Sequence, residues 1–198
     1  FKYLVLNNRL TLYARKDALV SAEGALPGAA PYTRGTSAVR GGTGWDIRTI
    51  HVERDPAVAN AAILEDLEGG VNSIALHVGG PGLPISKEAL ETALAGVLLD
   101  VCPVALIAGE RAFDAALALN AVWAARAIPD DARSGSFGAD PLGTLAITGR
   151  LAEPLDTVMA RAVALVKTTM SMPRVTALSA DGLAYHVAGA SEVQELAL

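Results

Sequence analysis

The sequence holds a single cysteine, Cys102, among its 198 residues, so no disulfide can form within the chain. This thiol lies in the apolar run VCPVALIA, and we expect it to be a small buried side chain rather than a nucleophile. A chain without disulfides is typical of a reducing compartment. We therefore expect a cytoplasmic protein.

Aromatic residues are also scarce, at 5%, and the net charge of -5 comes without any cluster of Lys and Arg. Such a chain has no basic stripe that could follow a phosphate backbone, which argues against nucleic-acid binding. No stretch reaches the roughly 18 uncharged apolar residues that a membrane span needs. The start, FKYLVLNNRL, has neither the layout of a signal peptide nor a Met, so we expect the natural N-terminus to lie upstream.

Short apolar runs typical of strands alternate with longer runs of helical period. In the first of them, period two places Thr49 and His51 on one face and Arg48 and Ile50 on the other. Strands followed by helices of this length predict an α/β fold, with a parallel sheet and crossover helices. The predicted strands are 46–53, 72–78, 103–108, 134–140 and 174–180, and the predicted helices are about 55–68, 86–99, 110–128 and 154–170, with a further one from Ser191.

The sequence lacks both the G-x-G-x-x-G and the G-x-x-x-x-G-K-[ST] motif, which identify the nucleotide-binding forms of an open doubly wound sheet. The alternative is a (β/α)₈ TIM barrel, which takes about 250 residues. About five of its eight β/α units are predicted within 45–198, so the barrel would be truncated and its open edge would need a cover. Residues 1–44 are loop-rich and predict an N-terminal arm.

Three histidines, His51, His77 and His186, fall near the carboxyl ends of predicted strands, where barrel active sites form. We do not expect a metal site, because the only cysteine lies elsewhere. Solvated or hydrogen-bonded loop histidines are the simpler interpretation, and it leaves their roles open.

Other candidate chemistry is weak. There is no G-x-S-x-G elbow, and we do not expect Ser179, Asp181 and His186 to form a catalytic triad. Asp140, in GADPLG, is expected to cap the backbone of a turn before Pro141. The segment GTSAVRGGTG, with arginines at 34, 40 and 48 around it, could cradle a phosphate or pair with carboxylates of a partner chain, and composition does not separate these alternatives.

Four segments, PYTRG (31–35), WDIR opening a strand, GADPLGTL and SADGLAYHVAGAS, occur in an order and at a spacing that resembles the adenosylcobalamin-dependent acyl-CoA mutases, above all methylmalonyl-CoA mutase. The resemblance covers about residues 25–198, and PYTRG is its most specific element. It implies an acyl-CoA threaded through the barrel axis and cobalamin on the carboxyl face of the barrel. It also implies a separate cobalamin-binding domain further along.

The chain departs from the family where the resemblance would place catalytic groups. The tyrosine of the family's first strand falls at Ile50, and the histidine that binds the thioester carbonyl falls at Ala184, with Tyr185 and His186 shifted by two positions. The arginine for the substrate carboxylate falls near Thr148. We therefore expect no catalytic, cofactor-binding or metal-binding residue in this chain.

This pattern resembles the small, non-catalytic subunit of the heterodimeric bacterial members of the family. The expected role is to support a catalytic large subunit, which would hold adenosylcobalamin and isomerise methylmalonyl-CoA and succinyl-CoA. The expected pairing surface consists of Tyr32, Thr33, Arg34 and Gly35. Two alternatives stay open: an active mutase for another acyl-CoA that uses His77 or His186, and an unrelated α/β enzyme for a small molecule.

Overall fold

The chain divides into two compact units, Asp46–Ala184 and a smaller unit made of Phe1–Trp45 and Tyr185–Leu198. The computed structural model describes residues 2–6, 9–13, 26–29, 38, 45–195 and 197. PYTRG, with Tyr32, Thr33, Arg34 and Gly35, lies outside the described residues.

The smaller unit contains a two-stranded antiparallel sheet, which the sequence pattern did not indicate. Strand β1 (Lys2–Leu6) pairs with β2 (Arg9–Tyr13), with Lys2 opposite Tyr13. The helix expected from Ser191 is only the four-residue α8 (Glu192–Glu195), and the short α7 (Leu183–Val187) precedes it. Gly189, at φ +92°, lies between them in a conformation that interrupts a helix.

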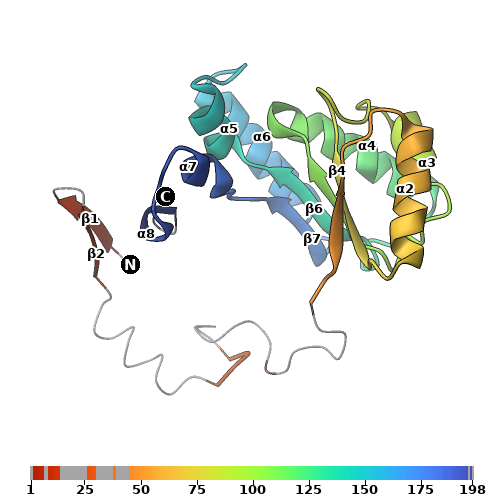
Figure 1. Cartoon of the computed structure of the whole chain (residues 1–198), viewed down its shortest axis with the longest axis horizontal. Coiled ribbons are helices and arrows are strands. Elements are labelled where there is room, and N and C mark those ends of the chain that lie inside the picture. Colours follow the sequence, from red (N-terminus) through yellow and green to blue (C-terminus); the bar gives the residue numbers. More distant parts are fainter. Residues whose placement is uncertain are drawn as a thin grey trace. The chain divides into compact units, whose positions relative to one another are not determined.

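The larger unit is built on a five-stranded parallel sheet (Figure 1). Its strands lie side by side in chain order, and all five sequence predictions are confirmed, each strand being slightly shorter than predicted. The strands are β3 (Arg48–His51), β4 (Ser73–His77), β5 (Val104–Ile107), β6 (Ser134–Ala139) and β7 (Arg174–Leu178).

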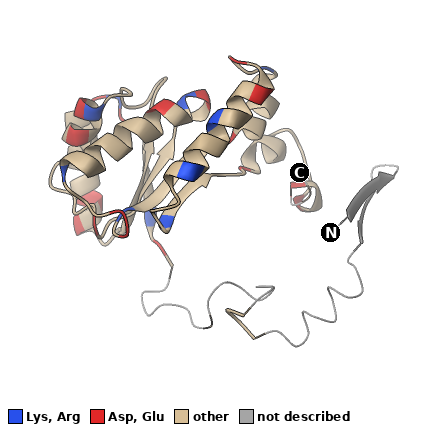
Figure 2. Ribbon diagram, turned by 180° about the vertical axis from the view of Figure 1, so that it is seen from behind, with Lys and Arg blue, Asp and Glu red and all other residues tan. Residues whose placement is uncertain are grey.

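Four helices cover one face of this sheet, as the front and back views show (Figures 1 and 2). Under them, the alternate side chains Ile74 and Leu76 of β4 and Val104 and Leu106 of β5 are buried. Trp123 of α4 lies 5.8 Å from Phe137 of β6 between ring centroids, in a tilted arrangement that aromatic pairs favour. The helices are α2 (Pro56–Glu68), α3 (Lys87–Ala93), α4 (Ala112–Ala125) and α6 (Leu155–Thr168).

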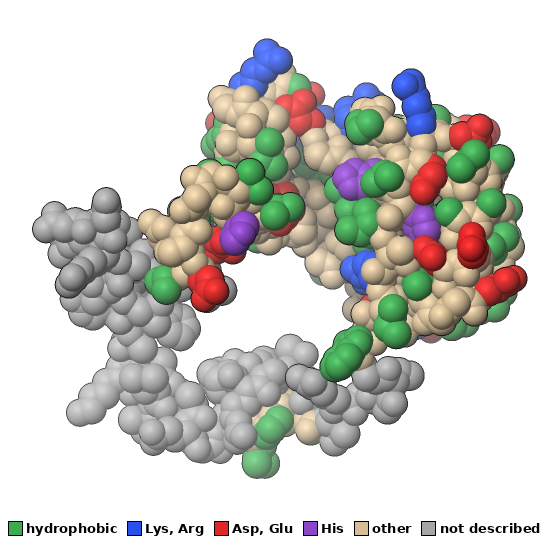
Figure 3. Space-filling model, viewed as in Figure 1, with side chains coloured by type: hydrophobic (Ala, Val, Ile, Leu, Met, Phe, Trp, Pro, Cys, Tyr) green, Lys and Arg blue, Asp and Glu red, His purple; other side chains and the backbone are tan. Residues whose placement is uncertain are grey.

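The central row of the opposite face of the sheet carries mostly small side chains. A row of register partners crosses it from β3 to β7, through Ile50, Ala75, Ala105, Ser136 and Thr176. Figure 3 shows hydrophobic and charged side chains interspersed over this side of the unit. The Ile50 side chain, at the edge strand, is 57% exposed.

Helix boundaries follow from local capping. Asp55 caps α2 by accepting from the Ala57 backbone N–H at 2.8 Å, and Pro56 takes the first helical position. The second predicted helix is too long, because α3 ends at Ala93 and Gly96 then turns the chain at φ +79°. The third predicted helix begins instead as a 3₁₀ turn, η1 (Gly109–Arg111), before α4.

Candidate functional site

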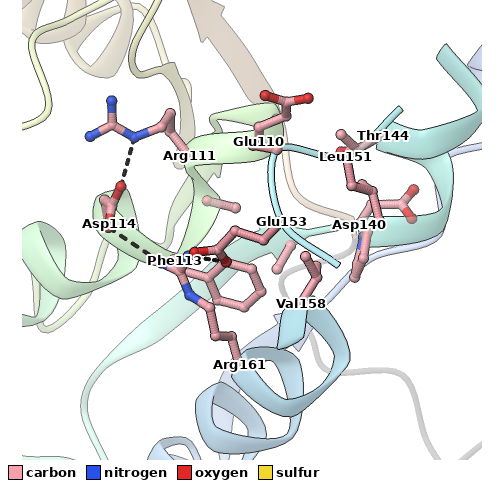
Figure 4. Close-up of a pocket in the computed structure, with 15 residues that line it drawn as sticks. Glu110, Arg111, Phe113, Asp114, Asp140, Thr144, Leu151, Glu153, Val158 and Arg161 are labelled. Atoms are coloured by element: carbon pink, nitrogen blue, oxygen red, sulfur yellow. Dashed lines mark hydrogen bonds and ion pairs between the residues drawn. The ribbon is translucent and has the colours of Figure 1, made fainter. Parts of the chain in front are cut away.

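A cavity of about 150 Å³ lies beyond the carboxyl ends of β5 and β6 (Figure 4). Ligand sites of parallel α/β sheets form at this end of the strands. We refer to it as the β5–β6 cavity. Its lining comprises Gly109, Glu110, Arg111, Ala112, Phe113, Asp114, Ala139, Asp140, Pro141, Thr144, Leu151, Ala152, Glu153, Val158 and Arg161.

Asp140 shapes the cavity through its backbone contacts. Its Oδ1 accepts from the Gly143 N–H at 2.8 Å and so caps α5 (Pro141–Thr148), a helix that the sequence analysis did not predict. Its Oδ2 accepts from the Asp181 N–H at 3.0 Å, which ties the end of β6 to the segment after β7. The capping role expected for Asp140 is therefore confirmed, although the turn it caps is a helix.

Two arginines and two carboxylates form a paired network on the lining. Arg111 Nε lies 2.6 Å from Asp114 Oδ2, and Arg161 lies 2.9 Å from Glu153 Oε2 and 3.5 Å from Asp114 Oδ1. The Arg161 guanidinium also stacks over Phe113, 4.7 Å from the ring centroid. Both guanidiniums thus already have carboxylate partners.

This network was not predicted from the sequence. Arg111 and Asp114, three residues apart at a helix start, give a local signal that could have been recognised. The contact between Phe113 and Arg161 joins α4 to α6 across nearly fifty positions in sequence, and no local sequence pattern predicts it.

The three histidines lie in different environments. His51 is not a loop residue: it lies at the end of β3 with a side chain only 3% exposed. His77 ends β4 and is half-buried. His186 lies in α7 rather than at a strand end, and its Nδ1 contacts Glu195 Oε1.

The residues at the family's catalytic positions lie in three different elements. Ile50 lies on the face of β3 away from the helices, and Ala184 lies in α7. The Thr148 hydroxyl, near the position of the family's carboxylate-binding arginine, donates to the Thr144 carbonyl of its own helix at 2.8 Å.

Two members of the Ser179, Asp181 and His186 set have partners outside it. Asp181 Oδ1 accepts from the Leu183 N–H at 2.9 Å, and His186 has Glu195 as its carboxylate partner. In the part of the chain that the structure describes, no group of three or more His, Cys, Asp or Glu side chains is placed to hold a metal ion. Among those same residues, no helix has the length and apolar character to cross a membrane.

Comparison with known proteins covers nearly the whole chain. The family model described as methylmalonyl-CoA mutase matches residues 73–198. The chain is 45% identical over 93% of its length to the methylmalonyl-CoA mutase small subunit of Streptomyces virginiae, and 36% identical over 94% to that of Propionibacterium freudenreichii subsp. shermanii. It is 34% identical over 94% to the probable methylmalonyl-CoA mutase small subunit of Mycobacterium tuberculosis strain H37Rv.

The chain covers 28 to 29% of the length of these relatives, so it spans less than a third of the proteins that it matches. The family match itself extends over more than half of the chain, from the start of β4 to residue 198. The order of motifs from WDIR to SADGLAYHVAGAS and the model match agree on one assignment. The chain belongs to the methylmalonyl-CoA mutase family.

Proposed function

We propose that this chain is part of the small, supporting subunit of a methylmalonyl-CoA mutase. Its catalytic large subunit would interconvert methylmalonyl-CoA and succinyl-CoA, and adenosylcobalamin would be held by that partner and not by this chain. The observation that carries the proposal is the 45% identity to a relative named as a small subunit. The side chains at the family's catalytic positions, Ile50 and Ala184, support a non-catalytic role because neither can donate a hydrogen bond.

The five-stranded sheet would be the first part of a (β/α)₈ barrel. In a doubly wound sheet the strand order reverses and helices cover both faces, whereas β3 to β7 follow chain order and four helices share one face. The small side chains of the other face, such as Ala75 and Ala105, would then line the barrel interior. The remaining units would come from parts of the protein beyond this chain.

The N-terminal arm would supply the contact with the large subunit, through Tyr32, Thr33, Arg34 and Gly35. The motif persists although the catalytic positions do not, which supports a role in pairing rather than in chemistry. The single buried cysteine suits a protein that works in the cytoplasm.

Co-expression with a mutase large subunit tests the proposal. We expect the two chains to elute together in size-exclusion chromatography, and we expect isomerisation of methylmalonyl-CoA by the pair but not by this chain alone. Arg34→Ala should weaken co-elution. Lys167→Ala removes the same charge from the exposed surface of α6 and should leave co-elution intact.

Turnover of methylmalonyl-CoA by this chain alone would overturn the proposal. Turnover of another acyl-CoA by this chain alone would overturn it too and favour an active mutase for that substrate, with His77 or His186 as the first residues to replace. Equal loss of co-elution with both variants would show that the effect of Arg34→Ala is not specific to the arm. The proposed pairing surface would then be wrong, although the chain could still be a supporting subunit.

A further inference from the structure

The β5–β6 cavity contains one charged group that has no partner in the part of the chain that the structure describes. The two guanidiniums pair with Asp114 and Glu153, and Asp140 accepts two backbone N–H groups. Glu110, exposed on η1, makes no hydrogen bond or ion pair to a described residue. The uncommitted charge of the lining is therefore negative.

Helix termini do not reverse this balance. The positive ends of α4 and α6 each have a carboxylate in the first turn, Asp114 and Asp156, and Asp140 caps α5. An added anion would have to displace Glu153 or Asp114 from Arg161. An added cation needs no displacement.

A second polar group opens on the same cavity. Thr144 is only 8% exposed and lines the cavity, and its hydroxyl makes no hydrogen bond to a described residue. A hydroxyl that opens on a cavity without a protein partner can donate to a ligand or accept from one. Helix α5, which carries Thr144, packs against η1, which carries Glu110.

The rest of the lining is apolar and suits a ligand with a short apolar chain. Phe113, Leu151 and Val158 contribute aromatic and aliphatic surface. The volume of about 150 Å³ is several times what one water molecule occupies, so a molecule of a few non-hydrogen atoms fits.

We propose that the β5–β6 cavity binds a small organic monocation, a short-chain alkylammonium, whose ammonium group pairs with Glu110 and donates to the Thr144 hydroxyl. This inference goes beyond the supporting-subunit role and does not depend on it. The alkyl chain of the ligand lies against the apolar lining.

Titration of the isotopically labelled full chain with n-butylammonium, followed by NMR, tests the proposal. We expect saturable shifts of the Phe113 and Thr144 resonances. Sodium butyrate and 1-butanol, which match the chain length with negative and zero charge, should bind more weakly. Glu110→Gln should weaken n-butylammonium binding by about two- to fivefold, the effect of one exposed ion pair.

Control variants distinguish binding in the cavity from a general effect of the charge of the chain. Glu88→Gln removes the same charge from the exposed surface of α3 and should leave binding unchanged. Thr144→Val should weaken binding, while Thr144→Ser, which keeps the hydroxyl, should retain it. Equal binding of n-butylammonium and butyrate or 1-butanol would overturn the proposal, and so would shifts that do not saturate or that Glu88→Gln reduces as much as Glu110→Gln.

Discussion

The imidazole of His51 lies between two carboxylates, with Nε2 3.6 Å from Asp66 Oδ2 and Nδ1 3.7 Å from Glu53 Oε2. His51 Nε2 and Glu53 Oε2 are buried and have no hydrogen-bond partner among the described residues. A protonated imidazole can donate from both nitrogens, so small shifts would complete a bridge from edge strand β3 to the end of α2.

We predict that His51→Ala lowers the free energy of unfolding by about 1 to 3 kcal/mol, because it deletes a buried side chain and takes the imidazole away from the buried Oε2 of Glu53. Urea denaturation measures this loss. In a double-mutant cycle, His51→Ala and Asp66→Asn should be coupled by about 1 kcal/mol.

Glu65→Gln, at an exposed position of the same helix, is the control and should change stability by less than about 0.5 kcal/mol. Additive effects of His51→Ala and Asp66→Asn would mean that the two side chains do not interact.

Burial raises the pKa of the Cys102 thiol, and the carboxylate of Asp46 adds to this, while Arg48 and a backbone hydrogen bond oppose it. Because the pKa is higher in the folded chain, the folded state holds the thiol proton more tightly. The resulting stability is fully present below the ordinary thiol pKa of about 8.5 and is lost as the pH rises through the folded-state value.

We therefore predict slow reaction of Cys102 with a thiol reagent at pH 7 in the folded chain and fast reaction in urea. The rate in increasing urea should follow the unfolding transition. Rapid labelling in buffer without urea would show that the thiol is accessible in the folded state, contrary to its 7% exposure.

Much of the sheet could be predicted from the sequence, because strands and capped helices leave local signals. The period-two pattern around Thr49 and Ile50 correctly separated the two faces of β3, and the Asp55–Pro56 pair located the start of α2. Helix α5 was missed because GADPLG also suits a turn, and only the Asp140 contact with Gly143 distinguishes the two.

The candidate site could not be predicted in the same way. Its lining joins η1, α5 and the start of α6, and residues such as Phe113 and Arg161 meet only through the packing of separate helices. His51 was predicted as a loop histidine although one carboxylate neighbour, Glu53, is only two residues away, and its other neighbour, Asp66, is a full helix away in sequence. Long-range contacts of this kind depend on tertiary structure rather than on local propensity.

The two tryptophans offer a matched pair for the core. Trp123 is fully buried against Phe137, whereas Trp45 is 80% exposed. We predict that Trp123→Ala lowers the free energy of unfolding by about 3 to 5 kcal/mol, as expected for deletion of a buried indole. Trp45→Ala should change it by less than about 0.5 kcal/mol.

Circular dichroism during thermal unfolding compares these variants without relying on either indole. A smaller loss for Trp123→Ala than for Trp45→Ala would contradict the core arrangement described for α4 and β6.

Gly135 is the position in β6 where a side chain is least compatible with the fold. Its φ is +135°, and a Cβ built there would lie 1.8 Å from the Val104 carbonyl oxygen of the neighbouring strand. Gly135→Ala must therefore separate β5 from β6 or change the backbone of β6. We predict a loss of about 3 kcal/mol or more from overpacking and backbone strain together.

Gly149, at φ +70° beyond α5, has open space where its Cβ would lie. Gly149→Ala should therefore cost only the strain of a left-handed residue, about 1 kcal/mol. Urea denaturation of both variants separates the two contributions, since both replace a glycine of positive φ and only one brings a Cβ against a strand. Equal losses would mean that the close approach of β5 and β6 at Gly135 does not limit the side chain there.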